Sequence, residues 1–444
     1  MSAGRIVLVL IALVALLALG GMAWIATGPG PLAFAAESAG GSYAGPSPSG
    51  VPAELAKADP VARGRYLTQA ADCESCHTAS GGAPFAGGRA FRTQFGVLYS
   101  TNLTPDRSTG LGAWSDADFL RGLHEGIGRD GQRLYPAFPY DAYAHMSDAD
   151  ALAIRAYLAT LQPIRQADRP DAMLIPFDQR WLMAIWAKLF AREQGFEPVA
   201  GRSAEWNRGA YLAEALAHCG ACHTPRNLLQ GLDNRRKFSG AVAQGWQAYN
   251  ITSDRLTGVG AWRDDELADY LSKGHADGRG TASGPMGEAV DLSLTHLTPS
   301  DLHALVVYLR SVPALRARAL PAKLAGPAPA SPKSLVPVVG GERGKRIFEG
   351  ACSSCHGWDG RGQLTTYAAL TGSRAVNDPS AVNVAQIVLS GSRRTTPHGE
   401  TFMPAFGAAY SDAEIAAVAN YVTGRFGSAA SHIDADDVAN LRQQ

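Results

Sequence analysis

The chain has 444 residues, with 40 Lys plus Arg against 40 Asp plus Glu, and therefore no formal net charge. A neutral chain lacks the basic surface that neutralises nucleic-acid phosphates, so nucleic acid is not expected as a partner. The hydrophobic fraction of 46% excludes an intrinsically disordered chain. At about 150 residues per domain, the length predicts about three domains.

The N-terminal segment is strongly apolar. Residues 6–27 contain no charged side chain and follow Arg5 directly. An apolar run of about 20 residues has the length of a transmembrane helix, whereas the apolar core of a signal peptide has about 7–15 residues. We therefore interpret residues 1–28 as a transmembrane anchor. A cleaved export signal is the alternative, because Ala33-Phe34-Ala35 has the form of a cleavage site. Both interpretations export the rest of the chain.

The six cysteines form three pairs with one spacing. In each pair two residues separate the cysteines and a histidine follows the second, which is the attachment signature of c-type haem. Two thiols on one helical turn can each form a thioether with a haem vinyl group, and the adjacent histidine then binds the iron. The pattern predicts three covalently bound haems c, held by Cys73, Cys76 and His77, by Cys219, Cys222 and His223, and by Cys352, Cys355 and His356.

Three other uses of these cysteines compete with haem attachment. An exported chain can pair six cysteines as disulfides, but disulfides do not require a histidine after each pair. Zinc sites use C-x-x-C pairs, but three such pairs with adjacent histidines form no regular set of four ligands. A thioredoxin-like motif would occur once, near a βαβ pattern. Haem attachment alone accounts for every cysteine and every adjacent histidine.

Methionine supplies the expected second ligand of each iron. Three of the seven methionines fall one per motif, downstream of it: Met146, Met286 and Met403. His/Met ligation is a known c-type pattern and raises the reduction potential. Met286 and Met403 lie in Pro-containing loops ahead of predicted helices. Met146 instead directly precedes Ser147, a predicted helix N-cap, and Phe138 stands where a loop methionine is expected, so His145, His124 or an open site remain alternatives for the first haem.

An internal repeat supports this division into modules. Residues 102–123 and 250–271 share Asn, Thr, Asp, Gly and Trp at matching positions. The sequence of each module predicts a helix that leads into the motif, then a long loop and a closing helix. Signals for strands are weak. The predicted fold is all-α, with three tandem c-type cytochrome domains and an N-terminal transmembrane helix. The predicted domains are 58–165, 201–318 and 339–428, with a flexible tether at 29–57, a linker with an amphipathic helix at 166–200, a Pro/Ala-rich linker at 319–338 and a loosely ordered polar tail at 429–444.

The chain resembles the triheme cytochrome c subunits of bacterial membrane-bound dehydrogenases. The resemblance covers nearly all of residues 59–427. Some members carry Met where this chain has Phe138. The motifs that support the resemblance, besides the three haem motifs, are residues 134–140 (LYPAFPY), Gln179-Arg180-Trp181, residues 206–212 (WNRGAYL) and residues 218–227 (HCGACHTPRN).

This resemblance implies an electron-transfer subunit that is not an enzyme by itself. The implied partner is a catalytic dehydrogenase of the molybdenum, quinoprotein or flavoprotein type that oxidises an aldehyde, alcohol or sugar acid. Electrons would pass on to ubiquinone or a terminal oxidase, at the periplasmic side of the bacterial inner membrane. The alternative is a haem enzyme, peroxidase- or reductase-like, with an open first-haem site.

Overall fold

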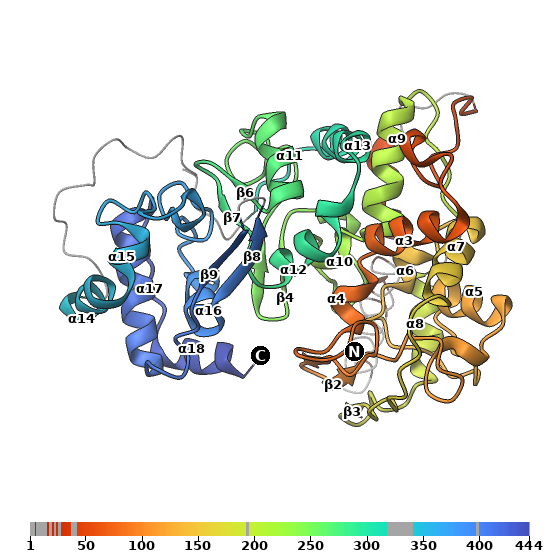
Figure 1. The fold of residues 1–444 in the computed structure, drawn as a ribbon, viewed down its shortest axis with the longest axis horizontal. Helices are drawn as coiled ribbons and strands as arrows, with labels where there is room; N and C mark the ends of the chain where they lie inside the picture. Colours follow the sequence, from red (N-terminus) through yellow and green to blue (C-terminus); the bar gives the residue numbers. More distant parts are fainter. Residues whose placement is uncertain are drawn as a thin grey trace.

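The computed structural model describes residues 28–36, 42–191, 195–317, 341–396 and 399–443, and five isolated residues nearer the N-terminus. The three modules lie in a row in Figure 1, with the first in red to yellow, the second in green and the third in blue. The Pro/Ala-rich linker at 319–338, and the predicted anchor apart from Gly28 and those isolated residues, lie outside the described residues.

The all-α prediction is wrong, because the described residues also form four small antiparallel sheets. The strands have only two to five residues, too few for the alternating pattern that reveals a strand in a sequence. One hairpin turns at Gln244 and Gly245, both with positive φ, as a type I′ turn requires. The strands are β1 (Ala90–Thr93), β2 (Gly96–Tyr99), β3 (Ala172–Met173), β4 (Ala241–Ala243), β5 (Trp246–Ala248), β6 (His275–Ala276), β7 (Gly280–Thr281), β8 (Ser392–Thr396) and β9 (Gly399–Met403).

The N-terminal transmembrane helix in that prediction is not found among the described residues either. In the ranges that the structure describes, no helix is both long and apolar enough to cross a membrane. The first helix there is the short α2 (Ala33–Ala36).

The first module follows the predicted helical plan. Its entry helix is capped by the carboxylate of Asp59, and its closing helix by the hydroxyl of Ser147, the N-cap that the sequence predicted. The helices are α3 (Pro60–Ala70), α4 (Cys73–His77), α5 (Asp116–Glu125), α6 (Tyr140–Tyr143) and α7 (Asp148–Leu158), with 3-10 turns at Ala53–Leu55 and Leu111–Ala113.

The second and third modules repeat this plan, and their entry helices reach the motif through a π-helical turn. In module two the helices are α9 (Ala204–Tyr211), α10 (Gly220–His223), α11 (Asp264–Lys273), α12 (Gly284–Leu292) and α13 (Pro299–Ser311). In module three they are α14 (Gly341–Ile347), α15 (Ser353–His356), α16 (Val382–Ser390) and α17 (Asp412–Phe426). The π turns are Leu212–Leu216 and Phe348–Cys352, and further 3-10 turns are Asn234–Arg236, Leu294–His296 and Thr366–Ala368.

A glycine lets the entry helix touch the closing helix in every module. A Cβ on Gly64 would overlap the carbonyl oxygen of Ala153, and one on Gly209 would overlap that of Ala304. Gly344 meets Ala417 in the same way. Any larger residue would push the two helices apart and move the motif at the end of the entry helix.

Modules one and two exchange buried hydrogen bonds across their interface. Tyr66 of α3 donates to Asp301 of α13 (2.6 Å), and Tyr211 of α9 donates to Asp150 of α7 (2.6 Å). Each tyrosine follows its crossing glycine by two residues, so the same position of both modules makes the same contact. Within module two, the half-buried Arg208 forms an ion pair with the same Asp301 carboxylate (2.6 Å). The two modules therefore form one pseudo-symmetric unit.

The predicted amphipathic helix, α8 (Leu182–Phe190), packs between these two modules. Trp186 is buried, stands edge-on to Tyr140 of module one and donates to the carbonyl of Leu229 in module two (2.9 Å). The opposite face, with Trp181 and Ile185, is exposed. Packing between the two modules therefore accounts for the buried side of this helix.

Module three is joined to module two by polar contacts. Asn383 of α16 bonds both backbone groups of Gln247 in β5, at 2.8 and 3.0 Å. Arg394, 2% exposed, donates to the carbonyl of Gly287 (2.6 Å) and pairs with Asp291 (3.0 Å). These contacts hold module three against module two within the described part of the chain.

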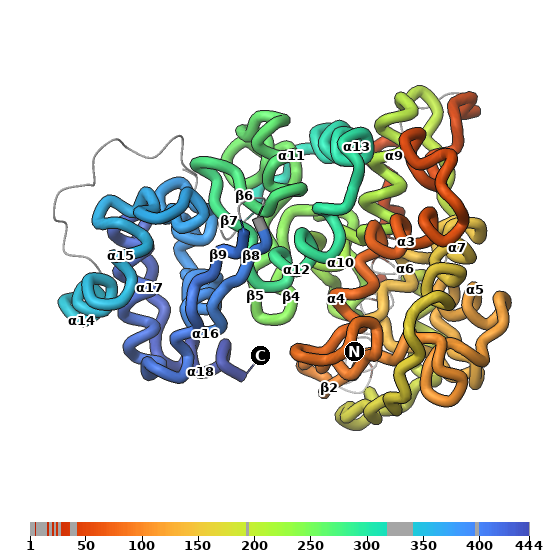
Figure 2. Tube along the Cα trace, in the orientation of Figure 1, coloured from red at the N-terminus to blue at the C-terminus, as the bar shows by residue number. Residues whose placement is uncertain are grey.

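The C-terminal tail is ordered, contrary to the prediction from its polarity. It forms α18 (Ala435–Arg442), which lies against α16 and α17 (Figure 2). Val438 is fully buried, and Arg442 pairs with Asp412 at the start of α17 (2.7 Å). One buried valine and one ion pair are too weak a pattern to predict this helix from the sequence.

Replacing Tyr66 by Phe should lower the free energy of unfolding by about 1–3 kcal/mol, because the buried carboxylate of Asp301 loses a donor. Chemical denaturation of the haem-loaded protein measures this. Tyr410→Phe is the matched control, since the hydroxyl of Tyr410 has no hydrogen bond in the described ranges. Equal stability of the two variants would show that the exchanged hydrogen bonds do not hold the modules together.

Candidate haem sites

Each C-x-x-C-H motif lies on a short helix directly after the entry helix. Cys73, Cys76 and His77 all belong to α4, which places the two sulfurs on one turn. Cys219 precedes α10, which contains Cys222 and His223. Cys352 ends the π turn before α15, which contains Cys355 and His356. All six thiols are free of disulfides, so each is available for a thioether bond.

The three histidines make the same hydrogen bond through Nδ1. His77 donates to the carbonyl of Thr101 (2.7 Å), His223 to that of Tyr249 (2.6 Å) and His356 to that of Ala368 (2.6 Å). A carbonyl oxygen can only accept, so Nδ1 carries the hydrogen and Nε2 keeps its lone pair. A histidine that binds a metal through one nitrogen and donates through the other has this arrangement.

Burial in the three motifs favours the uncharged forms of the histidine and cysteine side chains. Burial lowers the pKa of His77, His223 and His356, which leaves each imidazole uncharged with its lone pair available. Burial also raises the pKa of the Cys76 and Cys352 thiols to about 11 and that of Cys219 to about 12. These thiols therefore stay protonated at neutral pH and are not activated nucleophiles.

The predicted methionine ligands occupy unequal positions. Met286 lies in α12 and Met403 ends β9, and both are partly buried against the core of their own module. Met403 shares its core with Cys352, and Met286 and Cys219 pack on the larger core of modules one and two. Met146 is 2% exposed and packs inside that core. All three assignments stay predictions.

The residues present fit haem c. Each module combines two free thiols, a neutral histidine with a free Nε2 and an apolar core beside them. By contrast, no group of three or more His, Cys, Asp or Glu side chains in the described ranges could hold a metal ion directly. A bound haem supplies the iron and its redox chemistry, while the chain supplies the axial ligands and the apolar surroundings.

The sequence did not reveal the backbone acceptors of the histidines or a half-buried arginine beside one of them. Arg374 of module three is half-buried, lies over the ring of Tyr249 (4.9 Å) and donates to the carbonyl of Thr257 in module two. Burial lowers its pKa to about 10, so the guanidinium remains charged at neutral pH. Nothing near Arg374 in the sequence indicates this contact, because its partners lie in another module.

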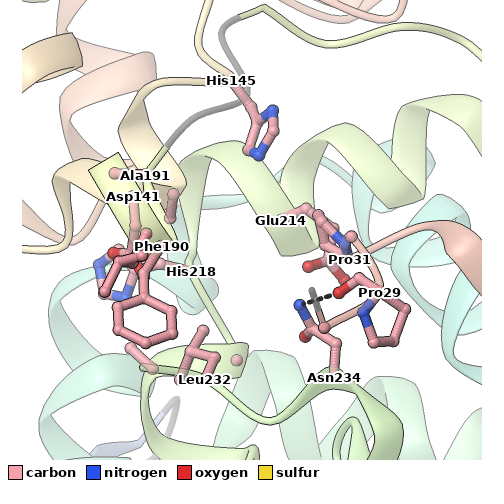
Figure 3. A pocket seen from close by; sticks show the side chains of 16 residues that line it. Pro29, Pro31, Asp141, His145, Phe190, Ala191, Glu214, His218, Leu232 and Asn234 are labelled. Atoms are coloured by element: carbon pink, nitrogen blue, oxygen red, sulfur yellow. Dashed lines mark hydrogen bonds between the residues drawn. The ribbon is translucent and has the colours of Figure 1, made fainter. Parts of the chain in front are cut away.

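A cavity of about 110 Å³ lies between modules one and two (Figure 3). Asp141, His145, Glu214 and His218 line it, and Asn234 donates to the carbonyl of Pro29 at its edge (3.1 Å). Burial lowers the pKa of His218 to about 4, so this imidazole is neutral. Of the predicted axial ligands and their alternatives, the cavity is lined only by His145, one of the alternatives for the first haem.

Comparison with known proteins agrees with these sites. The sequence profile of the family described as cytochrome c matches residues 61–162 and 341–425, which are the first and third modules. The chain is 37% identical to the fructose dehydrogenase cytochrome subunit of Gluconobacter japonicus, over 86% of this chain and 82% of that protein. It is 36% identical to the gluconate 2-dehydrogenase cytochrome c subunit of Pantoea cypripedii, over 86% and 89%.

The chain belongs to the family of dehydrogenase cytochrome c subunits. It is also 41% identical to a subunit of the nicotinate dehydrogenase of Pseudomonas putida over 82% of its own residues, but it spans only 30% of the length of that protein. The resemblance noted in the sequence is thereby confirmed. As a member of this family, the chain binds haem c through its cytochrome c domains and is the electron-transfer component of a dehydrogenase.

Replacing Met403 by Ala should lower the reduction potential of one haem, because His/Met ligation raises it. The expected shift is on the order of a hundred millivolts, within the ~0.8 V over which axial ligands set haem potentials. A potentiometric titration followed in the visible spectrum measures it. Met183→Ala, on α8, is the control. Unchanged potentials in Met403→Ala would remove Met403 as a ligand.

Proposed function

We propose that the chain carries three haems c and transfers electrons from a separate catalytic dehydrogenase subunit to ubiquinone or a terminal oxidase. The observation that carries the proposal is the histidine hydrogen bond, which is the same in all three modules. The second module, which the cytochrome c profile does not match, repeats this bond and the thiol spacing. When bound, haem c supplies one-electron redox chemistry.

The chain's own residues serve this role by holding the sites rigid and neutral. The carbonyls of Thr101, Tyr249 and Ala368 fix the imidazole planes, and Met286 and Met403 are proposed to complete two of the three ligand sets. The exchanged Tyr66 and Tyr211 hydrogen bonds keep the first two sites at a constant separation. A fixed geometry lets electrons pass without large rearrangement of the protein.

The proposed partner is a dehydrogenase that oxidises an aldehyde, alcohol or sugar acid, and its cofactor is a molybdenum centre, a quinone cofactor or a flavin. Relatives named as subunits of fructose, gluconate and nicotinate dehydrogenases support such a partner. We place the chain at the periplasmic side of the bacterial inner membrane. The apolar run at residues 6–27 supports this location, because the export machinery recognises N-terminal apolar segments.

A haem enzyme with an open first site is the second candidate. One observation favours an open site: Phe138, partly buried against the core, stands where a loop methionine is expected. Ligand binding at such a site would be necessary for peroxidase- or reductase-like chemistry, but it is not sufficient.

The haem count separates the three-haem proposal from a two-haem protein. A reduced pyridine haemochrome assay should give three haems per chain, and Cys219→Ala/Cys222→Ala should give two, because that variant has no thiols for the second haem. The matched control is Ser353→Ala/Ser354→Ala, which alters a motif without touching its cysteines. Two haems in the unaltered chain would contradict the proposal.

Electron transfer is tested on the complex isolated from native membranes. Under anaerobic conditions, the substrate of the catalytic subunit should reduce the haems, and a ubiquinone analogue should reoxidise them, both followed in the haem α-band. The isolated chain with the same substrate is the control and should show no reduction. Substrate oxidation by the isolated chain would instead support the haem-enzyme candidate.

A further inference from the structure

Modules one and two have one geometry after their middle helices, α5 and α11. Both helices end at a left-handed glycine, Gly126 (φ 63°) and Gly274 (φ 66°). A short antiparallel pairing follows, and the chain then bonds back to the glycine, from Leu134 N to Gly126 O (2.8 Å) and from Ala282 N to Gly274 O (2.7 Å). Ile127 pairs with Arg133 in module one, and His275 pairs with Thr281 in module two. The paired residues lie at the same distances after Gly126 and Gly274, so the two segments correspond residue by residue without a gap.

Phe138 lies four residues after Leu134, and Met286 lies four residues after Ala282. The correspondence between the two segments therefore pairs Phe138 with Met286. Module three has the same order of elements: α16 ends at Gly391 (φ 71°), a hairpin follows, and Met403 is its last residue. Methionine thus ends the hairpin in module three and lies five residues after the hairpin in module two, whereas module one has phenylalanine at the position that corresponds to Met286. Phe138 is partly buried, with its ring 5.4 Å from that of Tyr143.

Met146 corresponds to a different position. It directly precedes the N-cap Ser147 of the closing helix, as Leu297 precedes the N-cap Thr298 and Tyr410 precedes Ser411. Met146 is 2% exposed and Leu297 is 6% exposed, and both belong to the same apolar core. Since leucine cannot bind iron, the shared role of this position is core packing.

The two histidines considered for the first haem are held elsewhere. His145 donates through Nδ1 to the carbonyl of Gly195 (2.9 Å) and lines the cavity between the modules. His124 Nδ1 lies 3.6 Å from the Asp148 carboxylate, which draws the ring to the start of α7. Its Nε2 is buried and has no partner in the described ranges. His124 is therefore one of the alternative ligands that the experiment below distinguishes.

We infer that the first haem has no side-chain ligand at its sixth coordination position, that Phe138 covers this position, and that the site binds small neutral ligands of the carbon monoxide class. The inference rests on the proposed three-haem function. An apolar ring over the position disfavours anions, because they would lose their hydration. The first haem would also lack the rise in reduction potential that methionine ligation gives.

Carbon monoxide titration of the reduced protein tests the inference. The unaltered chain should bind one CO per three haems, and Phe138→Met should bind none and show a raised potential for one haem. Met286→Phe, the reciprocal exchange, should bind two. Phe402→Met is the matched control, since this ring is 65% exposed on β9 and its replacement should leave one CO bound.

A protein with three haems that binds no CO would overturn the inference and leave the proposed function intact. In that case, appearance of CO binding in Met146→Leu would identify Met146 as the ligand, and its appearance in His124→Ala would identify His124. Fewer than three haems in the unaltered chain would instead contradict the proposed function. If Phe138→Met fails to fold, the CO stoichiometry of the unaltered chain decides whether one position is open, and Met286→Phe shows whether phenylalanine at the corresponding position opens another.

Discussion

The contact on which each module depends is the crossing of its entry and closing helices at a glycine. Gly64, Gly209 and Gly344 bring backbone against backbone, since a Cβ at any of them would overlap a carbonyl oxygen of the closing helix. The entry helix leads directly into the C-x-x-C-H motif, so this crossing sets where the two thiols and the histidine lie relative to the core. The loop between motif and closing helix then returns a carbonyl to the histidine.

That returning carbonyl explains why loops of different length give equivalent sites. The acceptor lies 24 residues after His77, 26 after His223 and only 12 after His356. Module three therefore reaches the same hydrogen bond with a much shorter loop than the other two modules. What the three modules share is the position of one backbone oxygen, and any residue type can supply it.

Contacts between the modules link the sites to one another. Tyr249, whose carbonyl accepts from His223, donates through its hydroxyl to Asp378 of module three (3.2 Å), and its ring lies under Arg374. Tyr367, next to the acceptor Ala368, stacks on His275 of module two (4.4 Å). The surroundings of the second and third histidines thus meet at one interface, where Arg374 places a positive charge.

The sequence by itself determined the number and order of the C-x-x-C-H motifs, the helices on either side of each and the family, because thioether attachment needs residues that are neighbours in the chain. It also predicted the N-cap at Ser147, a local signal. It did not reveal the short strands, the ordered tail, the Arg374 contact or the exchange between Tyr66 and Asp301, which lie 235 residues apart. Only the tertiary structure decided these, because such relations arise from packing between segments that are distant in the sequence.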